Sequence, residues 1–538
     1  MALGLRRIPK PFSLKGSLRA NKGNTTMNGA DAILATLADN GVEACFANPG
    51  TSEMHFVSAL DREPRIRPVL CLFEGVVTGA ADGYGRMAGK PAATLLHLGP
   101  GYANGIANLH NARRAQTPIV NVIGDHATYH RKFDAPLTSD IEALARPNSC
   151  WIGVAEDPDH AAYLATEAIR ASFGPPGGSA CLILPADCAW SPARRTGPTI
   201  EPPSRRAPHG AAIDAAAKAL RAAAKPVILI GGQACEARGL AAAGRLAAHG
   251  IRVVTDTFVA RQPRGAGRFS PDKMLYFAEM ALSDLAGVDL MVTAGTSQPV
   301  AFFAYPAMPS ILVPEGCAEL SLAGREADAA VALEALAEAL GAPAEAVSNG
   351  FGVPDRPTGE LNAYTIGASI ARHMPEDSVI SDDSVTASLP VFMQTRGARP
   401  HEWLALTGGA IGQGIPVAIG AAVACPDRKV LALTGDGAGM YTVQGLWTIA
   451  REALDVAVVV FANHSYRILG IELLRTGAGK AGASAASLLD LGDPRIDWTA
   501  LASGMGLPSV RCDSAEAFDA AMASAMSRKG PIVIEAAL

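Results

Sequence analysis

Residues 430–437, VLALTGDG, form an apolar run that ends in an aspartate between two glycines, and a second apolar run, residues 456–461 (VAVVVF), ends just before Asn463. Short apolar runs of this kind are typical of buried parallel strands. An acidic side chain at the tip of one strand and an amide at the tip of the next suit a hard cation such as Mg²⁺. An aspartate between glycines is by itself typical of a turn, so the spacing from Asp436 to Asn463, with Ser465 two residues on, carries the prediction of a metal site.

A second feature is Glu74, a carboxylate embedded in the apolar run 72–77 (LFEGVV) directly before a segment with helical spacing. Burial of an unpaired carboxylate is costly, so we expect Glu74 to be protonated or to form a hydrogen bond. The alternative is an acid at a helix N-terminus that the helix dipole stabilises.

A third feature is the glycine-rich stretch 407–416 (TGGAIGQGIP), which precedes a small-residue helix predicted over residues 417–424. Four glycines in eight residues predict backbone that is presented to a ligand rather than a packed surface of side chains. A glycine-rich turn before a helix is common in α/β proteins, so this feature gains its weight from the other two.

The three motifs, in this order and at these distances, resemble those of thiamin-diphosphate (ThDP) enzymes, and the resemblance covers residues 27–538. It implies that Mg²⁺, held by Asp436, Asn463 and Ser465, binds the diphosphate, and that Glu74 hydrogen-bonds the aminopyrimidine ring and activates the coenzyme. Gly409 would offer its carbonyl to the exocyclic amine, and Ile411 would wedge beneath the coenzyme. The predicted coenzyme-binding residues are Gly409, Ile411, Gly435, Gly437, Ala438, Ser384 and Thr386.

The resemblance also predicts the reaction, in which ThDP supplies carbanion chemistry and the protein orients it. His97, at the end of an apolar strand, aligns with an acid/base histidine of benzoylformate decarboxylases, although a core histidine is the alternative. Thr51, in the loop 48–53 (NPGTSE), takes the place of a serine that contacts the substrate carboxylate. Leu469 and Ile471 are expected to limit the size of the substrate pocket.

The activity that we expect is decarboxylation of a 2-oxo acid and transfer of the resulting acyl carbanion, as in acetolactate synthase large-subunit-like proteins. Simple decarboxylation of the benzoylformate decarboxylase type is the runner-up. Departures from the synthase pattern, among them Ile411 in place of methionine and the presence of His97, weaken the first reading. A non-catalytic ThDP-fold subunit and a flavin-linked oxidase stay open, as does FAD in the central unit.

The rest of the chain predicts three doubly wound, parallel-sheet α/β domains, over residues 27–191, 210–341 and 360–538. The first is expected to bind the pyrimidine and the third the diphosphate and Mg²⁺. In the central domain we predict strands at Pro226–Ile230, Arg252–Asp256, Leu290–Ala294 and Ser310–Val313.

The composition of the chain limits the classes of function that it can have. The formal charge of −5 gives no sign of binding to nucleic acid, and no apolar run approaches the roughly 20 residues that cross a bilayer. Nine cysteines without a paired motif predict a cytoplasmic protein without zinc. Residues 1–26 carry only basic charges and are expected to be a disordered extension.

ThDP relatives join their first and third domains across two chains, so we expect a homodimer or homotetramer. A small regulatory subunit is left open as a partner.

Overall fold

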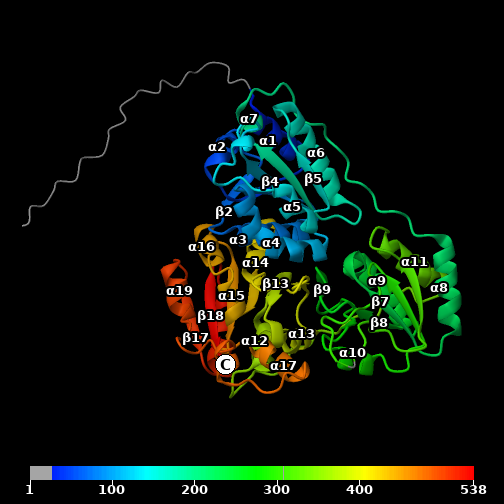
Figure 1. Ribbon diagram of the computed structural model, residues 1–538. Coiled ribbons are helices and arrows are strands. Elements are labelled where there is room, and N and C mark those ends of the chain that lie inside the picture. The colour runs from blue at the N-terminus through cyan, green and yellow to red at the C-terminus, as the bar shows by residue number, and fades with distance from the viewer. Residues whose placement is uncertain (1–26, 307) are drawn as a thin grey trace, which may run out of the picture.

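The computed structural model describes residues 27–306 and 308–538, and in these the chain folds into three α/β units with sheets of six, five and seven strands (Figure 1). The basic extension predicted for residues 1–26 lies outside the described residues. The prediction of three parallel-sheet units is confirmed, with one antiparallel exception that joins the second unit to the third.

The first unit is a parallel sheet in the order β2-β1-β3-β4-β6-β5, with helices on both faces. Its three central strands are buried along their whole length, as expected for apolar runs in a sheet that is covered on both sides. The strands are β1 (Ala44–Asn48), β2 (Arg67–Leu70), β3 (Ala92–Leu96), β4 (Ile119–Asp125), β5 (Trp151–Val154) and β6 (Ser179–Pro185). The helices are α1 (Gly29–Asp39), α2 (Met54–Leu60), α3 (Glu74–Ala88), α4 (Leu98–Ala115), α5 (Ile141–Ala145), α6 (Pro158–Phe173) and α7 (Ala186–Trp190).

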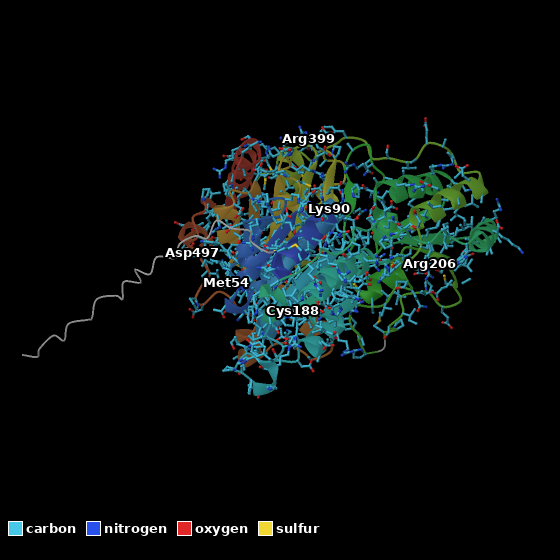
Figure 2. The ribbon with its side chains drawn as sticks, turned by 90° about the horizontal axis from the view of Figure 1, so that it is seen from above. Met54, Lys90, Cys188, Arg206, Arg399 and Asp497 are labelled. Carbon is cyan, nitrogen blue, oxygen red and sulfur yellow. The ribbon has the colours of Figure 1, made fainter. Side chains whose placement is uncertain are left out.

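The central unit has the strand order β10-β8-β7-β11-β12 and extends to one side of the other two, as the position of Arg206 in Figure 2 shows. The prediction of a strand at Ser310–Val313 is wrong, because Ile311 makes only an isolated bridge to Val300. The edge strand of this sheet is β12, further along the chain. The strands are β7 (Pro226–Ile230), β8 (Arg252–Thr255), β10 (Asp272–Lys273), β11 (Leu290–Ala294) and β12 (Ala318–Ala323). The helices are α8 (Gly210–Ala222), α9 (Ala237–Ala248), α10 (Ala278–Asp284) and α11 (Ala329–Leu340).

The third unit has the strand order β17-β18-β16-β15-β13-β14-β9. Its edge strand β9 (Gln262–Arg264) comes from the central stretch of sequence and pairs antiparallel with β14. The other strands are β13 (Ser378–Asp383), β14 (His401–Leu404), β15 (Val430–Gly435), β16 (Val456–Ala462), β17 (Ser509–Cys512) and β18 (Ile532–Ala537). The helices are α12 (Ala363–His373), α13 (Ser388–Gln394), α14 (Gly414–Ala424), α15 (Asp436–Met440), α16 (Gly445–Arg451), α17 (Arg467–Arg475), α18 (Ala483–Ser487), α19 (Trp498–Gly504) and α20 (Ala515–Ser527).

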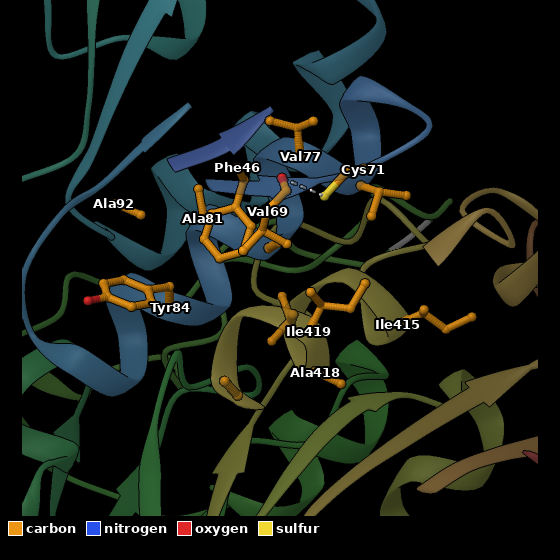
Figure 3. Close-up of a cluster of buried hydrophobic side chains, with 14 of the residues drawn as sticks. Phe46, Val69, Cys71, Val77, Ala81, Tyr84, Ala92, Ile415, Ala418 and Ile419 are labelled. Carbon is orange, nitrogen blue, oxygen red and sulfur yellow. Dashed lines mark hydrogen bonds between the residues drawn. The ribbon is translucent and has the colours of Figure 1, made fainter. Parts of the chain in front are cut away.

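The first and third units pack through α3 and α14, which cross in a shared apolar core (Figure 3). The crossing is close because small residues face each other: a Cβ added at Gly83 would overlap the Val417 carbonyl, and one added at Gly420 would overlap the Ala80 carbonyl. Figure 3 shows Ile415, Ala418 and Ile419 of α14 beneath α3. The glycine-rich turn that begins α14 is therefore fixed against the first unit.

A buried ion pair on α3 holds the segment that leads into the glycine-rich turn before α14. Arg86, near the end of α3, pairs with Asp82 at 2.6 Å, and both side chains are almost fully buried. The Arg86 guanidinium also donates to the Ala405 carbonyl at 2.8 Å and to Thr407 Oγ1 at 3.1 Å. The start of the glycine-rich stretch is thus tied to α3 by charge-assisted hydrogen bonds.

Among the helices of residues 27–306 and 308–538, none combines the length and apolarity that crossing a bilayer requires.

Candidate active site

Asp436 stands directly after β15 and opens α15, where it is 2% exposed. Its two carboxylate oxygens accept hydrogen bonds from the backbone N–H groups of Gly437 (2.9 Å) and His464 (2.6 Å). Burial raises the pKa of Asp436, and these hydrogen bonds partly offset the effect. Asn463 follows β16, the parallel neighbour of β15, so that the two predicted metal ligands end adjacent strands.

A cavity of about 240 Å³ opens at this edge of the third sheet. It brings together nine of the residues predicted from the sequence and is lined by residues 360–538 of the third unit. Those nine residues are Ser384, Thr386, Ile411, Gly435, Asp436, Gly437, Ala438, Asn463 and Ser465.

The donors around the cavity fit a magnesium-bound diphosphate. Gly437 leaves room for the Tyr466 ring, which a Cβ added there would overlap. The side-chain oxygen Oδ1 of Asn463 accepts a hydrogen bond from the Ser465 N–H at 3.0 Å. Among the described residues no three His, Cys, Asp or Glu side chains cluster around one point. One carboxylate and one amide nevertheless suit Mg²⁺, which usually takes its remaining ligands from water and phosphate oxygens.

Glu74 begins α3 and is 7% exposed. Each of its carboxylate oxygens accepts one amide hydrogen bond at 3.0 Å, from Asn48 Nδ2 at the end of β1 and from Asn104 Nδ2 on α4. An ionised carboxylate has about four acceptor positions, so Glu74 can accept a further hydrogen bond from a ligand. Neither Asn48 nor Asn104 was predicted from the sequence, although Asn48 stands in the loop 48–53 that contains Thr51.

His97 caps α4 beside Glu74. Gly101 shows their closeness, because a Cβ added there would lie 3.2 Å from His97 Cβ and 3.4 Å from Glu74 Oε1. His97 Nδ1 lies 2.9 Å from Glu53 Oε2, and Ser52 Oγ donates to the other oxygen of Glu53 at 2.5 Å. The buried Glu53 carboxylate fixes the imidazole orientation and favours the tautomer with Nδ1–H, which leaves Nε2 for a ligand.

Glu53 was not predicted as a site residue. Its place in the loop 48–53, which also carries Thr51, was the one signal in the sequence that could have found it. Thr51, predicted to contact the substrate carboxylate, is exposed at the start of the 3₁₀ turn Thr51–Glu53. Ser52, rather than Thr51, joins the hydrogen-bonded group with His97 at 3.3 Å.

Gly409 lies in a left-handed conformation (φ +76°), and the residues on both sides of it are held by α4. His110 Nε2 is 3.1 Å from the Gly408 carbonyl, and Asn111 Nδ2 donates to the Ala410 carbonyl at 2.8 Å. The backbone at Gly409 is therefore positioned by the first unit.

Asp383, at the end of β13, supports the glycine-rich stretch from below. Its Oδ2 accepts from the N–H groups of Gly412 (2.8 Å) and Gly414 (3.2 Å). Burial raises the pKa of Asp383 to about 7. Asp383 was not singled out from the sequence, where it is one of two aspartates at the end of an ordinary apolar run.

Within one chain, α4 contacts Glu74 and the backbone beside Gly409 at two separate points. Asn104 contacts Glu74 and Asn111 contacts Ala410, so the two contacts are seven residues apart along α4, or about 10 Å at 1.5 Å per residue. The cavity at Asp436 is likewise lined by the third unit and not by Glu74, His97 or Thr51. Leu469 and Ile471, on α17, also lie outside its lining.

Comparisons with known proteins identify the class. Residues 27–144 match the family model "Thiamine pyrophosphate enzyme, N-terminal TPP binding domain", and residues 387–536 match its C-terminal TPP binding domain. A Mycobacterium tuberculosis protein named "Putative acetolactate synthase large subunit IlvX" is 48% identical over 95% of this chain and 98% of its own length. The chain therefore belongs to the family of thiamin-diphosphate-dependent enzymes.

Two further relatives carry decarboxylase names. The benzoylformate decarboxylase of Pseudomonas aeruginosa is 26% identical over 93% of this chain and 96% of its own length. The solved structure of the ThDP-dependent 4-hydroxybenzoylformate decarboxylase of Rhodococcus jostii has the same fold, with a TM-score of 0.82, 23% identity, and coverage of 95% of this chain and 99% of that one. The chain is thus related to both acetolactate synthases and benzoylformate decarboxylases.

FAD, which the sequence left open for the central unit, finds no support. In a doubly wound sheet a dinucleotide binds at the carboxyl ends of the strands. There Asp256, after β8, accepts a hydrogen bond from Thr296 at 2.9 Å, and a Cβ added at Gly231 would overlap its carboxylate. Burial raises the pKa of Asp256 to about 6. Its negative charge when ionised opposes a diphosphate at this place.

Proposed function

We propose that the protein is a ThDP- and Mg²⁺-dependent 2-oxo acid decarboxylase that releases an aldehyde. The observation that carries this proposal is the Glu53–His97 pair beside Glu74, because it supplies an oriented imidazole for proton transfer. This reverses the order expected from the sequence, which placed transfer of the acyl carbanion first. That transfer is the second candidate, supported by the 48% identity to a protein named as an acetolactate synthase subunit.

The proposed roles follow from the contacts. Asp436 and Asn463 hold Mg²⁺ and, through it, the diphosphate, while Gly435, Gly437 and Ala438 let the diphosphate approach the backbone. When bound, ThDP supplies the carbon nucleophile and accepts the electron pair left by departing CO₂. Glu74 accepts a hydrogen bond from the pyrimidine ring. His97 Nε2 moves a proton to or from the reacting carbon or its oxygen.

Product analysis tests the proposal. Purified protein with Mg²⁺ and ThDP is incubated with pyruvate or with benzoylformate, and the aldehyde is separated from acetolactate. We expect one aldehyde for each CO₂ released; acetolactate as the main product from pyruvate would favour the second candidate. If neither substrate releases CO₂, both candidates are wrong.

Replacing His97 with glutamine is expected to lower kcat about 10²-fold, because the imidazole no longer transfers a proton, with little change in KM. Glu53→Gln is expected to have a smaller effect on kcat and to shift the pH profile, since Glu53 acts only through His97. Steady-state rates across pH 5.5–8.5 check both variants, and His209→Gln, at an exposed histidine directly before α8, is the matched control. An unchanged kcat for His97→Gln would contradict the assignment.

We further propose that each site takes Glu74 from one subunit and Asp436 from another, because Glu74 does not line the cavity at Asp436 of its own chain. Inactive Glu74→Gln and Asp436→Ala chains are mixed, dissociated and reassociated. Random pairing makes half of the dimers mixed, each with one intact site, so activity is expected to recover to about a quarter of the wild-type level. No recovery, although sedimentation shows mixed dimers, would mean that each site is built within one chain.

A further inference from the structure

An aromatic cluster of the central unit lies against the glycine that is expected to hold the coenzyme amine. A Cβ added at Gly409 would lie 2.8 Å from Phe302 Cζ, so the tip of the Phe302 ring contacts the Gly409 backbone. Phe302 stands on the segment after β11, far from Gly409 in sequence. The contact brings a side chain of the central unit to the coenzyme site.

Phe302 contacts every other member of a group of packed rings. Its centroid lies 5.0 Å from that of Tyr276, 5.6 Å from that of Phe258 and 5.4 Å from that of Phe303, mostly in edge-to-face arrangements. Phe302 remains 41% exposed, although a ring of this size is normally buried. An exposed aromatic surface beside a catalytic centre is typical of a ligand-binding wall.

The cluster is anchored on both sides. Phe258 packs against the core of the third unit, and the Ala405 N–H donates to the Val259 carbonyl at 3.2 Å. On the other side Tyr305 donates to Glu472 of α17 at 2.7 Å, and Arg475 of α17 forms an ion pair with Glu279 of α10. Figure 1 shows α17 beside α10. These contacts join the wall to α17, which carries Leu469 and Ile471.

The chemistry of the wall selects among 2-oxo acids. The segment 296–306 (TSQPVAFFAYP) contains no charged residue, so it offers no partner to a charged substrate side chain. Aromatic rings prefer offset or edge-to-face contact with another ring, at centroid distances of about 4.5–7 Å. A methyl group, as in pyruvate, would leave most of the exposed ring uncovered.

We propose that Phe302, backed by Phe258 and Tyr276, is a specificity-determining residue that selects 2-oxo acids with an aromatic side chain. This inference rests on the proposed 2-oxo acid chemistry and goes beyond it by naming the substrate class. Phe302 acts through contact with the substrate side chain and leaves the reacting atoms to Glu74 and His97.

The test compares kcat/KM for benzoylformate and pyruvate in the wild type and in Phe302→Ala, Phe302→Leu and the control Phe351→Ala, an exposed phenylalanine between the second and third units. We expect the wild type to prefer benzoylformate. Phe302→Ala should lower kcat/KM for benzoylformate about 10- to 100-fold and change that for pyruvate little. Phe302→Leu should fall between, because it keeps apolar bulk without the ring.

A binding measurement separates this inference from the proposed reaction. Benzoylformate binding is titrated calorimetrically into Glu74→Gln protein with Mg²⁺ and ThDP, with and without Phe302→Ala, and the second change should weaken binding at least about 10-fold. Equal losses for both substrates, a wild-type preference for pyruvate, or a change in oligomeric state in Phe302→Ala would overturn the inference. Absence of CO₂ release with intact binding would overturn the proposed function instead.

Discussion

Asp436→Ala is expected to weaken ThDP binding in the presence of Mg²⁺ by more than about 100-fold. Loss of an outer partner of a metal ligand already costs about 10- to 100-fold in affinity, and Asp436 would be a direct ligand. Asp436 is 2% exposed, and its carboxylate oxygens accept hydrogen bonds from two backbone N–H groups and lie 3.8 Å from His464 Nδ1, so no other carboxylate is at hand to replace the lost charge.

Calorimetric titration of ThDP at fixed Mg²⁺ measures this effect. Asp427→Ala, an exposed aspartate on the loop between α14 and β15, controls for the loss of a carboxylate in the same unit. Removal of Mg²⁺ by a chelator should reproduce the Asp436→Ala result in the wild type. Undiminished ThDP uptake by Asp436→Ala would remove the basis of the assigned metal site.

The second large effect is expected for Glu74→Gln, which should lower kcat about 10²- to 10⁴-fold while coenzyme affinity changes only a few-fold. Glutamine keeps the shape but not the charge that favours protonation of the ring. It also turns a donor toward one of the two asparagine amides, Asn48 or Asn104. Asn104 is exposed, so its amide can turn its oxygen toward the new donor, and the fold is expected to remain intact.

Exchange of the thiazolium C2 proton for deuterium, followed by NMR on the bound coenzyme, reports this step without a substrate. Wild-type protein should accelerate the exchange over free ThDP and Glu74→Gln should not; Glu43→Gln, an exposed glutamate near β1, is the control. Exchange in the wild type at the rate of free coenzyme would favour the non-catalytic alternative.

The sequence predicts those parts of the site that depend on local pattern. Asp436 and Asn463 end adjacent parallel strands, and strand ends can be read from apolar runs. Nine of the twenty residues that line the cavity in the third unit were predicted, some from strand ends and others from the resemblance to ThDP enzymes. The Ser310–Val313 strand was predicted wrongly for the same reason: an apolar run resembles a strand, but whether it joins a sheet is decided by tertiary pairing.

Contacts between distant segments could not be predicted in this way. Glu53 gains its importance from burial beside His97, and Asp383 from two N–H groups about 30 residues away. Phe302 could not be predicted as a site residue, because Gly409, which it contacts in the fold, is more than 100 positions further along the chain. Each of these depends on how the units pack, which no local periodicity encodes.

The position of β9, a strand from the middle of the chain in the sheet of the third unit, has a consequence for engineering by recombination. Gln262–Arg264 belongs to the middle of the chain but completes the edge of the third sheet, where its backbone covers β14. A chimera that swaps residues 210–341 for those of a relative would also replace this strand and the side chains that pack beneath it, among them Arg264, which stacks on Phe392. Modular exchange therefore needs crossover points that keep residues 256–264 with the carboxyl-terminal module, or a donor whose edge strand matches β14.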